Sequence, residues 1–417
     1  MTPTTAAPIA PAAVRAATAA TYAAFIGSGF AFASWAARIP QVRDRLHLDP
    51  ATLGLVLLAI AAGSLLALPL SGPVVTRFGS ARTVRAMAIL LGVGLTIAAF
   101  GSLVGVAPVV VGLFLLGFAN GAWDVAMNVQ GTVVERYLGR SIMSRFHAGF
   151  SLGTVAGALL GAAMVALHVS VAAHLAAVAL VVAVGVPWYA RRFVSDHDET
   201  EPVTAGEPSR SGALAAWREP RTLLVGVFVL AFAFAEGTGN DWISVAAIDG
   251  HHVADALGTL AFAGFLIAMT LGRWFAPGLL DRYGRVPVVR TLAVVALAGV
   301  VLFVFGPSPV YAFAGALLWG LGVSLGFPVG MSAGGDDPRR AAARVSVIAS
   351  IGYCAFLAGP PTIGFLGDHI TVLRALTVVA VLLGLAALVA ASVRPLRTEP
   401  AAPGTVRDDR GTLSPTG

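Results

Sequence analysis

Thr76-Arg77-Phe78-Gly79 is the stretch that decides the fold, because a second copy of it, Asp281-Arg282-Tyr283-Gly284, lies 205 residues further along the chain. Another matching pair, Leu116-Gly117 and Trp319-Gly320, is separated by nearly the same distance, 203 residues. Self-similarity at one offset is the signature of an internal repeat. The sequence therefore predicts two related halves of about 200 residues each.

Each half is made of long apolar runs. Of the 417 residues, 57% are apolar and 12% are charged, and the mean hydropathy is +0.84, whereas a soluble domain carries roughly 25% charged residues. A helix needs about 20 apolar residues to cross a membrane. Twelve runs meet this test: Ala16–Arg38, Ala51–Val75, Thr83–Leu103, Ala107–Thr132, Ile142–Ala166, Val171–Phe193, Pro220–Ala247, Ala256–Leu280, Val286–Gly306, Pro309–Ala333, Ala341–Leu366 and Ile370–Val393. We predict an all-α membrane protein with twelve transmembrane helices, arranged as two pseudo-symmetric six-helix bundles.

Polar segments divide the chain. Residues 194–219 are rich in acidic residues, proline and glycine, which bury too little apolar surface to fold, so we predict a flexible cytoplasmic linker there. Residues 394–417 have the same character and are predicted to be a disordered C-terminal tail. An N-terminal tail (1–15) and the two bundles (16–193 and 220–393) complete the predicted organisation.

The arginines predict which helix ends face the cytoplasm. All 27 basic residues are arginine, and if the N-terminus is inside, 22 of them fall on inside segments. Only Arg38, Arg43, Arg45 and Arg374 fall outside. Because basic residues concentrate on the cytoplasmic side of membrane proteins, both termini are predicted to be cytoplasmic, with the chain in the inner (plasma) membrane. The arginines are spread over many short loops, so the basic pI does not indicate nucleic-acid binding.

Two polar residues deep in the fourth predicted helix, Asp124 and Asn128, are candidate solute-binding or proton-coupling residues. Placing a charged side chain at the bilayer centre costs about 3 kcal/mol of free energy. A carboxylate therefore occurs there when it has a partner, faces water or takes part in function. Asn128 follows Asp124 by four residues, on the same helix face. The pair is either a protonatable acid beside a solute ligand or an interhelical hydrogen bond. His147, near the start of the fifth helix, titrates near physiological pH and is either a third such residue or an interfacial one.

The seventh predicted helix carries Glu236 near the middle of the membrane, with Asn240 and Asp241 about a turn further out. Glu236 is a candidate for the same role, whereas Asn240 and Asp241 either join it or reach the water outside. Gly237 and Gly239 follow Glu236, so we expect the helix to loosen there and to expose its backbone to a solute.

Arg273 lies inside the eighth predicted helix. Its deep counter-ion is either Asp124 or Glu236, because no other acid lies far enough into the membrane. An arginine that competes with a proton for a carboxylate provides a switch for proton coupling. In the alternative, Arg273 extends along its helix to the cytoplasmic interface.

The repeated stretch resembles a loop of the major facilitator superfamily, which reads roughly Gly-x-x-x-Asp-Arg-x-Gly-Arg between the second and third helices. Gly72–Gly79 matches it except that Thr76 stands where the acid is usual, and Gly278–Arg285 keeps the acid. The resemblance implies that both loops close the cytoplasmic side. The gate residues that it implies are Arg77, Gly79, Asp281, Arg282 and Gly284.

The chain is also similar to a narrower group, the fucose-permease-like sugar/proton symporters and their uncharacterised inner-membrane relatives. The matching stretches are Ser34–Pro40, Gly117–Asn128, Met143–Gly153 and Glu236–Trp242. In the sugar carriers, a fourth-helix carboxylate followed by small residues and an asparagine serves proton coupling and sugar binding, the pattern that Asp124 and Asn128 occupy. Those carriers also have an acid in the first helix, and this chain has none between Ala16 and Trp35.

The sequence lacks the motifs of an enzyme. It has no lysine for a Walker-type loop, a single cysteine, and neither an HExxH nor a GxSxG stretch, so we expect no enzymatic activity, no cofactor and no metal. We predict a monomeric secondary transporter in the lipid bilayer that carries a small solute with protons, such as a sugar, by alternating access. The alternative is a proton-coupled exporter of drugs or metabolites.

Overall fold

The chain folds into helices throughout the parts that the structure, a computed structural model, describes: residues 10–140, 142–196, 215–337 and 340–396. Within those ranges no strand occurs, and twelve stretches are long and apolar enough to cross a membrane. The predicted fold class is therefore confirmed. Most of the predicted linker (197–214) and of the C-terminal tail (397–417) lies outside the described residues.

The first half comprises seven helices: α1 (Pro11–Ala36), α2 (Ile39–Leu46), α3 (Pro50–Phe78), α4 (Ser80–Gly101), α5 (Val106–Leu138), α6 (Met143–Ala166) and α7 (Val171–Ala190). The second half comprises α9 (Pro220–His251), α10 (Asp255–Phe275), α11 (Pro277–Tyr283), α12 (Arg285–Phe305), α13 (Pro309–Val323), α14 (Gly326–Gly334), α15 (Ala341–Ile370), α16 (Val372–Ala375) and α17 (Thr377–Val389), followed by a 3₁₀ turn, Ala390–Val393. All twelve predicted helices are present. The tenth is divided into α13 and α14, and the short helices α2, α11 and α16 flank others.

The repeated stretch has the same backbone geometry in both halves. Gly79 ends α3 and precedes α4 with φ 80° and ψ 158°, and Gly284 ends α11 and precedes α12 with φ 81° and ψ 164°. A positive φ of this size with an extended ψ is accessible to glycine and strained for other residues. The tight turn between two spans therefore requires glycine at both positions.

The second pair of matching residues also occupies equivalent places. A Cβ on Gly117 of α5 would lie 2.0 Å from the carbonyl oxygen of Ile60 on α3, and a Cβ on Gly320 of α13 would lie 2.1 Å from that of Phe265 on α10. Small residues allow neighbouring membrane helices to approach backbone to backbone. The internal repeat read from the sequence is thus a repeat of helix packing.

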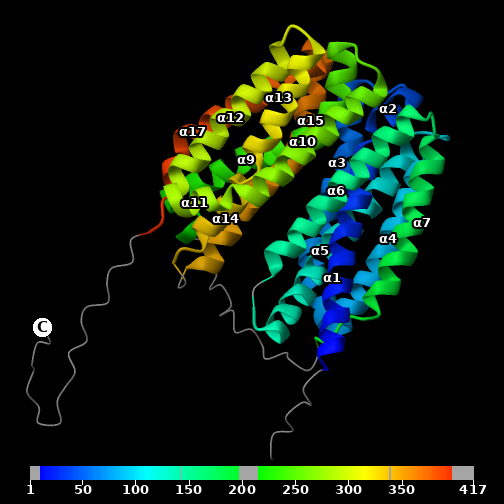
Figure 1. Cartoon of the computed structure of the whole chain (residues 1–417). Helices are drawn as coiled ribbons and strands as arrows, with labels where there is room; N and C mark the ends of the chain where they lie inside the picture. Colours follow the sequence, from blue (N-terminus) through cyan, green and yellow to red (C-terminus); the bar gives the residue numbers. More distant parts are fainter. Residues whose placement is uncertain (1–9, 141, 197–214, 338–339, 397–417) are drawn as a thin grey trace, which may run out of the picture.

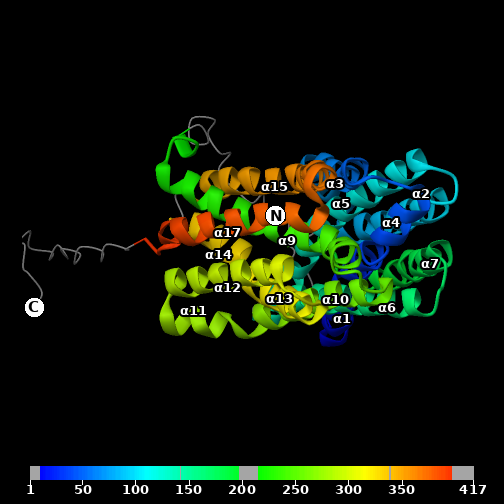
Figure 2. The ribbon, with the colours of Figure 1, turned by 90° about the horizontal axis from the view of Figure 1, so that it is seen from above.

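The two halves form separate bundles that lie side by side. Figure 1 shows α1 to α7 packed together as one bundle and α9 to α17 as the other. The view from above places α15 beside α3 and α10 beside α6 (Figure 2), and these two helix pairs carry most of the packing between the halves. Helices α3, α6, α10 and α15 therefore form most of the boundary between the two bundles.

Candidate solute and proton site

Arg273 and Glu236 form an ion pair inside the second bundle. The Arg273 guanidinium reaches from α10 to α9, where Nη2 donates to Glu236 Oε1 at 2.7 Å. Its Nε donates to the backbone carbonyl of Ser324 at 3.3 Å. Of the two counter-ions that the sequence left open, Glu236 is the partner, and Asp124 is not. The alternative in which Arg273 extends to the membrane interface is wrong, because both contacts hold the side chain inside the bundle.

The Ser324 carbonyl is available to Arg273 because the helix breaks there. Inside a helix this carbonyl would accept from the N–H of residue 328, but that residue is Pro328, which has no N–H and whose ring would collide with it. The helix α13 ends at Val323 and α14 begins at Gly326. The broken helix of this site is therefore the tenth span, and its free carbonyl is joined to the Glu236–Arg273 pair.

The expected loosening of the seventh span is wrong. Helix α9 runs unbroken from Pro220 to His251, through both glycines. The glycines serve packing instead: a Cβ on Gly239 would lie 2.6 Å from the Phe265 ring. Gly237 lies against the Phe356 ring, where a Cβ would meet it at 3.3 Å.

Asp124 and Asn128 lie together on α5, as predicted. The Asn128 amide donates to the Asp124 backbone oxygen at 2.8 Å and to its Oδ1 at 3.3 Å. The Asp124 side chain is exposed and lies within electrostatic reach of Tyr353 on α15, so it faces the other half. In the described part of the chain, its carboxylate has no arginine or histidine partner.

His147 brings a third titratable group from the first half to this boundary. Its side chain is exposed on α6, and its ring stands edge-on to Phe25 at 5.1 Å between centroids. The charge of Arg273 on α10 acts on this imidazole across the interface between the bundles. His147 lies on α6, which packs against α10, the helix of Arg273, and no hydrogen bond joins it to the Glu236–Arg273 pair among the described residues.

Asn240 and Asp241 are half-buried one turn beyond Glu236. The side-chain oxygen of Asn240 is buried without a hydrogen-bond partner in the described structure. No hydrogen bond or ion pair to the Asp241 carboxylate occurs among the described residues, so neither residue joins the Glu236–Arg273 pair. They border the site one turn beyond Glu236.

At the end of the molecule that carries α2, polar contacts join the two halves. Arg43 of α2 donates to both carboxylate oxygens of Asp249 at the end of α9, and Gln41 donates to Asp255 of α10 at 3.2 Å. We call these two pairs the α2 clasp. The sequence analysis missed it, since neither loop contains a motif; the signal was an acid on each side of the turn between α9 and α10.

Close backbone packing accompanies the α2 clasp. A Cβ on Gly54 of α3 would lie 2.5 Å from the carbonyl oxygen of Pro360, and one on Gly364 of α15 would lie 2.4 Å from that of Pro50. Both contacts cross from one half to the other at the ends of α3 and α15 nearest α2. The halves are therefore in direct contact there, with no room for a solute between these helices.

The predicted gate residues lie at the opposite, arginine-rich end and do not cross between the halves. Arg77 and Arg282 are exposed and lie over the rings of Phe78 and Tyr283, at 5.5 and 5.1 Å. Asp281 is exposed and has no ion-pair partner among the described residues. In this conformation the two loops are separate from one another.

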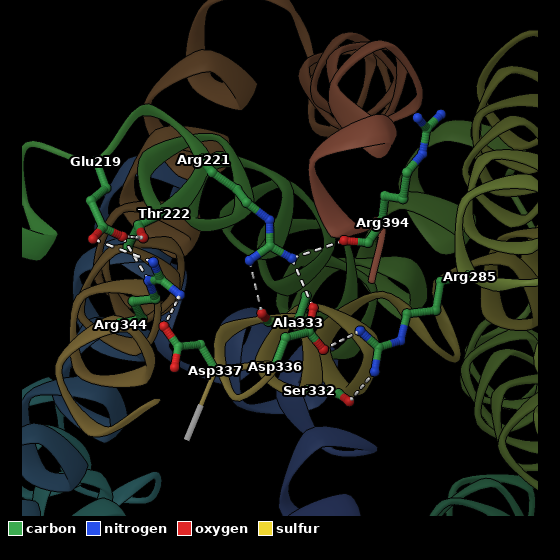
Figure 3. A network of polar contacts seen from close by, with 10 residues as sticks. All are labelled: Glu219, Arg221, Thr222, Arg285, Ser332, Ala333, Asp336, Asp337, Arg344 and Arg394. Carbon is green, nitrogen blue, oxygen red and sulfur yellow. Dashed lines mark hydrogen bonds and ion pairs between the residues drawn. The ribbon is translucent and has the colours of Figure 1, made fainter. Parts of the chain in front are cut away.

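The acid that organises this end of the second half is Asp336, which sequence reasoning missed. Asp336 accepts from Arg221 at 2.8 Å and from Arg285 at 2.7 Å, and Arg221 also reaches the backbone oxygen of Arg394 (Figure 3). Its side chain is only 10% exposed. We call Asp336 with Arg221 and Arg285 the Asp336 cluster. The signal in the sequence was the pair of adjacent acids between the tenth and eleventh spans.

Glu219, directly before α9, anchors a second group of contacts beside the Asp336 cluster. Arg344 of α15 donates to it at 2.7 Å and the Thr222 hydroxyl at 2.9 Å (Figure 3). Arg340 donates to it as well, at 2.8 Å. The hydrogen bond from Arg344, with smaller contributions from Thr222 and Arg340, lowers the pKa of Glu219 to about 2. The carboxylate is therefore charged at every physiological pH and serves as a fixed tie between α9 and α15.

No group of three or more histidine, cysteine or acidic side chains that could hold a metal ion occurs in the described ranges. The polar groups at the boundary between the bundles are instead a carboxylate, an amide, an imidazole and an ion pair.

Comparisons with known proteins agree with this architecture. A sequence model of the Major Facilitator Superfamily matches residues 19–354. The uncharacterised transporter y4wD of Sinorhizobium fredii is 31% identical over 369 residues, which cover 88% of this chain and 96% of that protein. An uncharacterised MFS-type transporter of Yersinia pestis is 31% identical over 373 residues, covering 89% and 93%.

Solved structures share the fold at low sequence identity. The nucleoside transporter NupG superposes with a TM-score of 0.69 at 15% identity, over 90% of this chain and 98% of that one. The E. coli fucose:proton symporter FucP has a TM-score of 0.55 at 15% identity, over 89% and 97%. At these identities the likeness concerns the path of the backbone.

Proposed function

Because the chain belongs to the major facilitator superfamily, it is a membrane transporter, and we propose that it carries a small polar solute such as a sugar together with protons. The observation that supports this most is that the two acids inside the spans differ in their bonding partners. Glu236 is neutralised by Arg273, whereas Asp124 has only the Asn128 amide. A lone carboxylate in a membrane is costly, and a proton removes that cost.

The proposed coupling uses both acids. Asp124 takes a proton while it faces the space between the bundles, and Asn128 beside it contacts the solute. Glu236 holds Arg273 until a proton or a solute group competes for one of them, because a neutral acid binds a guanidinium far less strongly than a carboxylate does. The names of two structural neighbours, a fucose:proton symporter and a nucleoside transporter, are consistent with a hydroxylated solute.

The proposed direction of opening follows from the α2 clasp. With both termini in the cytoplasm of a bacterial plasma membrane, α2 lies on the outer side and the arginine-rich loops lie on the inner side. The structure is then closed to the outside by the α2 clasp and the Gly54 and Gly364 contacts. Alternating access requires that these contacts break when the inner loops meet.

Solute-dependent alkalinisation of the medium tests the proposal. Cells that express the chain are given sugars, sugar acids and nucleosides in turn, without a buffer, and the external pH is recorded. Symport predicts a rise in pH on addition of the right solute, abolished by a protonophore. A pH that stays unchanged for every solute, together with a raised tolerance to drugs, would instead identify an exporter.

Asp124→Asn separates proton coupling from solute binding. We expect this variant to lose accumulation of the solute against its gradient and to retain counterflow exchange, which needs no proton. Asp124→Glu keeps the carboxylate and is the matched control, with accumulation retained at least in part. If Asp124→Asn accumulates solute as the unchanged protein does, the proton is not carried by this residue.

A further inference from the structure

A cavity of about 760 Å³ lies at the edge of the second half, where three membrane spans end. It is lined at the end of α12 by Phe305 and at the end of α15 and beyond by Asp368, His369, Thr371, Arg374 and Thr377. None of these residues belongs to the solute site. Gly367, in the same lining, packs on Pro50 of α3, so the cavity lies at the α2 end of the molecule.

The cavity contains two opposite charges that do not neutralise each other. Asp368 and Arg374 are both exposed, and in the described ranges neither side chain makes a hydrogen bond or an ion pair. Their proximity in one cavity without an ion pair leaves both charges available to a ligand. Thr371 has a φ of 84°, which is rare for a β-branched residue, and the turn that it makes returns the chain so that Arg374 lines the same cavity as Asp368.

The other polar groups in the cavity bond the backbone of the turn and of the helix end. His369 Nδ1 is paired with the carbonyl of Phe365 at 2.8 Å, which leaves Nε2 free. The Thr371 side chain accepts from the backbone N–H of Arg374, and the Thr377 hydroxyl donates to the backbone oxygen of Arg374. The backbone around Arg374 is thus fixed at both sides while its guanidinium remains free.

Large apolar side chains border the charges. Phe305 is 63% exposed and Phe365 is 60% exposed, and both lie in stretches that cross the membrane. Because both rings are exposed on stretches long and apolar enough to cross a membrane, they are available to contact lipid. A ligand held here therefore meets a cation, an anion and lipid-facing rings within one site.

We propose that this cavity binds the headgroup of a zwitterionic aminophospholipid, phosphatidylethanolamine, from the membrane leaflet on the α2 side. The phosphate pairs with the Arg374 guanidinium, and the ammonium group donates to the Asp368 carboxylate and lies near the Phe305 ring. The acyl chains run along the lipid-facing side of Phe365. Arginine binds phosphate through two parallel hydrogen bonds, and an ammonium ion on a carboxylate forms a charge-assisted hydrogen bond.

This ligand is favoured over a soluble one by position. A soluble zwitterion would give up water to contact Phe305 and Phe365, whereas a phospholipid already places its chains there. An anionic lipid would satisfy Arg374 and be repelled by Asp368, and a choline headgroup lacks the N–H donors that Asp368 accepts. Recognition of both charges together is therefore the specific expectation.

Lipid competition in nanodiscs tests the proposal on the full chain. Spin-labelled phosphatidylethanolamine, phosphatidylcholine and phosphatidylglycerol are compared at equal fractions in a neutral lipid background, and the immobilised fraction is measured. We expect phosphatidylethanolamine to be preferred, and Arg374→Gln or Asp368→Asn to lower its relative affinity about tenfold, equal to about 1.4 kcal/mol. Arg45→Gln, an exposed arginine at the same end but in the first half, is the matched control and should leave the affinity unchanged.

Three results would overturn the proposal. Equal immobilisation of all three lipids would show that no headgroup is recognised. A preference for phosphatidylglycerol that survives Asp368→Asn would show an anion site at Arg374 alone. Competition by free phosphoethanolamine as strong as that by the lipid would show a soluble ligand. Thermal unfolding of each variant, compared with the unchanged protein, verifies that a loss of binding does not reflect a loss of fold.

Discussion

The two ends of this transporter differ in what their polar contacts connect. At the α2 end, Arg43 and Gln41 of the first half bind Asp249 and Asp255 of the second. At the arginine-rich end, every hydrogen bond and ion pair between described residues stays within one half, as in the Asp336 cluster. The polar contacts at the α2 end therefore join the two halves, whereas those at the arginine-rich end stabilise each half separately.

The arginine-rich end also differs between the halves. In the first half, Ser80 stands where Arg285 stands in the second; its N–H donates to Asp196 at 2.7 Å, and a hydrogen bond of 2.9 Å joins its hydroxyl to the Gln130 amide. The first half uses a serine, an amide and one acid at this place, where the second half uses an acid between two arginines. Each half therefore has its own polar contacts at this end, but the residue types that make those contacts differ between the halves.

The largest effect is expected for Asp336→Asn. The change leaves Arg221 and Arg285 close together without their shared carboxylate, and removing one partner of a mostly buried ion pair is strongly destabilising. We expect the free energy of unfolding in detergent to fall by about 3 kcal/mol. Ser332→Ala, which removes a single hydrogen bond to Arg285, is the control, at about 1 kcal/mol. Equal losses in the two variants would show that the cluster adds nothing beyond single bonds.

The second largest effect is expected for Gly54→Leu, which acts between the halves. The new side chain occupies the place of the Pro360 carbonyl, so the α2 end cannot close fully. Spin labels on His47 and Ala254 report the separation of the halves by pulsed electron resonance. We expect the long-distance population to rise about tenfold. Gly185→Leu, at a glycine with open space around it, should leave the distances unchanged; a similar rise in both variants would contradict the assignment.

A smaller effect is expected for Arg43→Gln in the same measurement. The variant removes the Asp249 ion pair of the α2 clasp and keeps the close packing of α3 on α15. An exposed pair contributes about 0.2–1 kcal/mol, so the long-distance population should rise about two- to fivefold. An unchanged distance distribution would mean that packing alone holds this end.

The smallest effect is expected from the titration of Glu219. Its pKa is lowered from 4.5 to about 2, so the charged form is favoured in the folded state. The resulting stabilisation is complete above pH 4.5 and is lost as the pH falls toward 2. Unfolding free energies of the unchanged protein and Glu219→Gln should therefore differ at pH 6, by under about 1 kcal/mol, and converge below pH 3. A difference that persists at low pH would assign the effect to packing.

The fold was predictable because lipid imposes simple demands on sequence. The amino-acid sequence itself contains the long apolar runs, the arginine-rich loops and the repeat at Gly79 and Gly284. The structure confirms the spans and the equivalent turns. The pairing of Asp124 with Asn128 also followed from helix geometry alone. These features depend on local spacing.

The remaining parts of the site depend on which helices meet. Sequence spacing left Arg273 with two possible acids, and only the packing of α10 on α9 selects Glu236. The glycines after Glu236 suggested a loosened helix, but they are contact surfaces for rings from other helices. Pro328 is the local sign of the true break, but the apolar residues around it give the tenth span the pattern of a continuous helix.

The free carbonyl of Ser324 has a consequence for how this protein tolerates substitution. Arg273 binds the backbone oxygen of Ser324, so the bond does not depend on the serine hydroxyl, and Ser324→Ala should leave it in place. The vulnerable position is four residues away. Pro328→Ala would restore an N–H that competes with Arg273 for the Ser324 oxygen. A mutational scan would therefore find position 328 intolerant of substitution, although the group that matters is the carbonyl of residue 324.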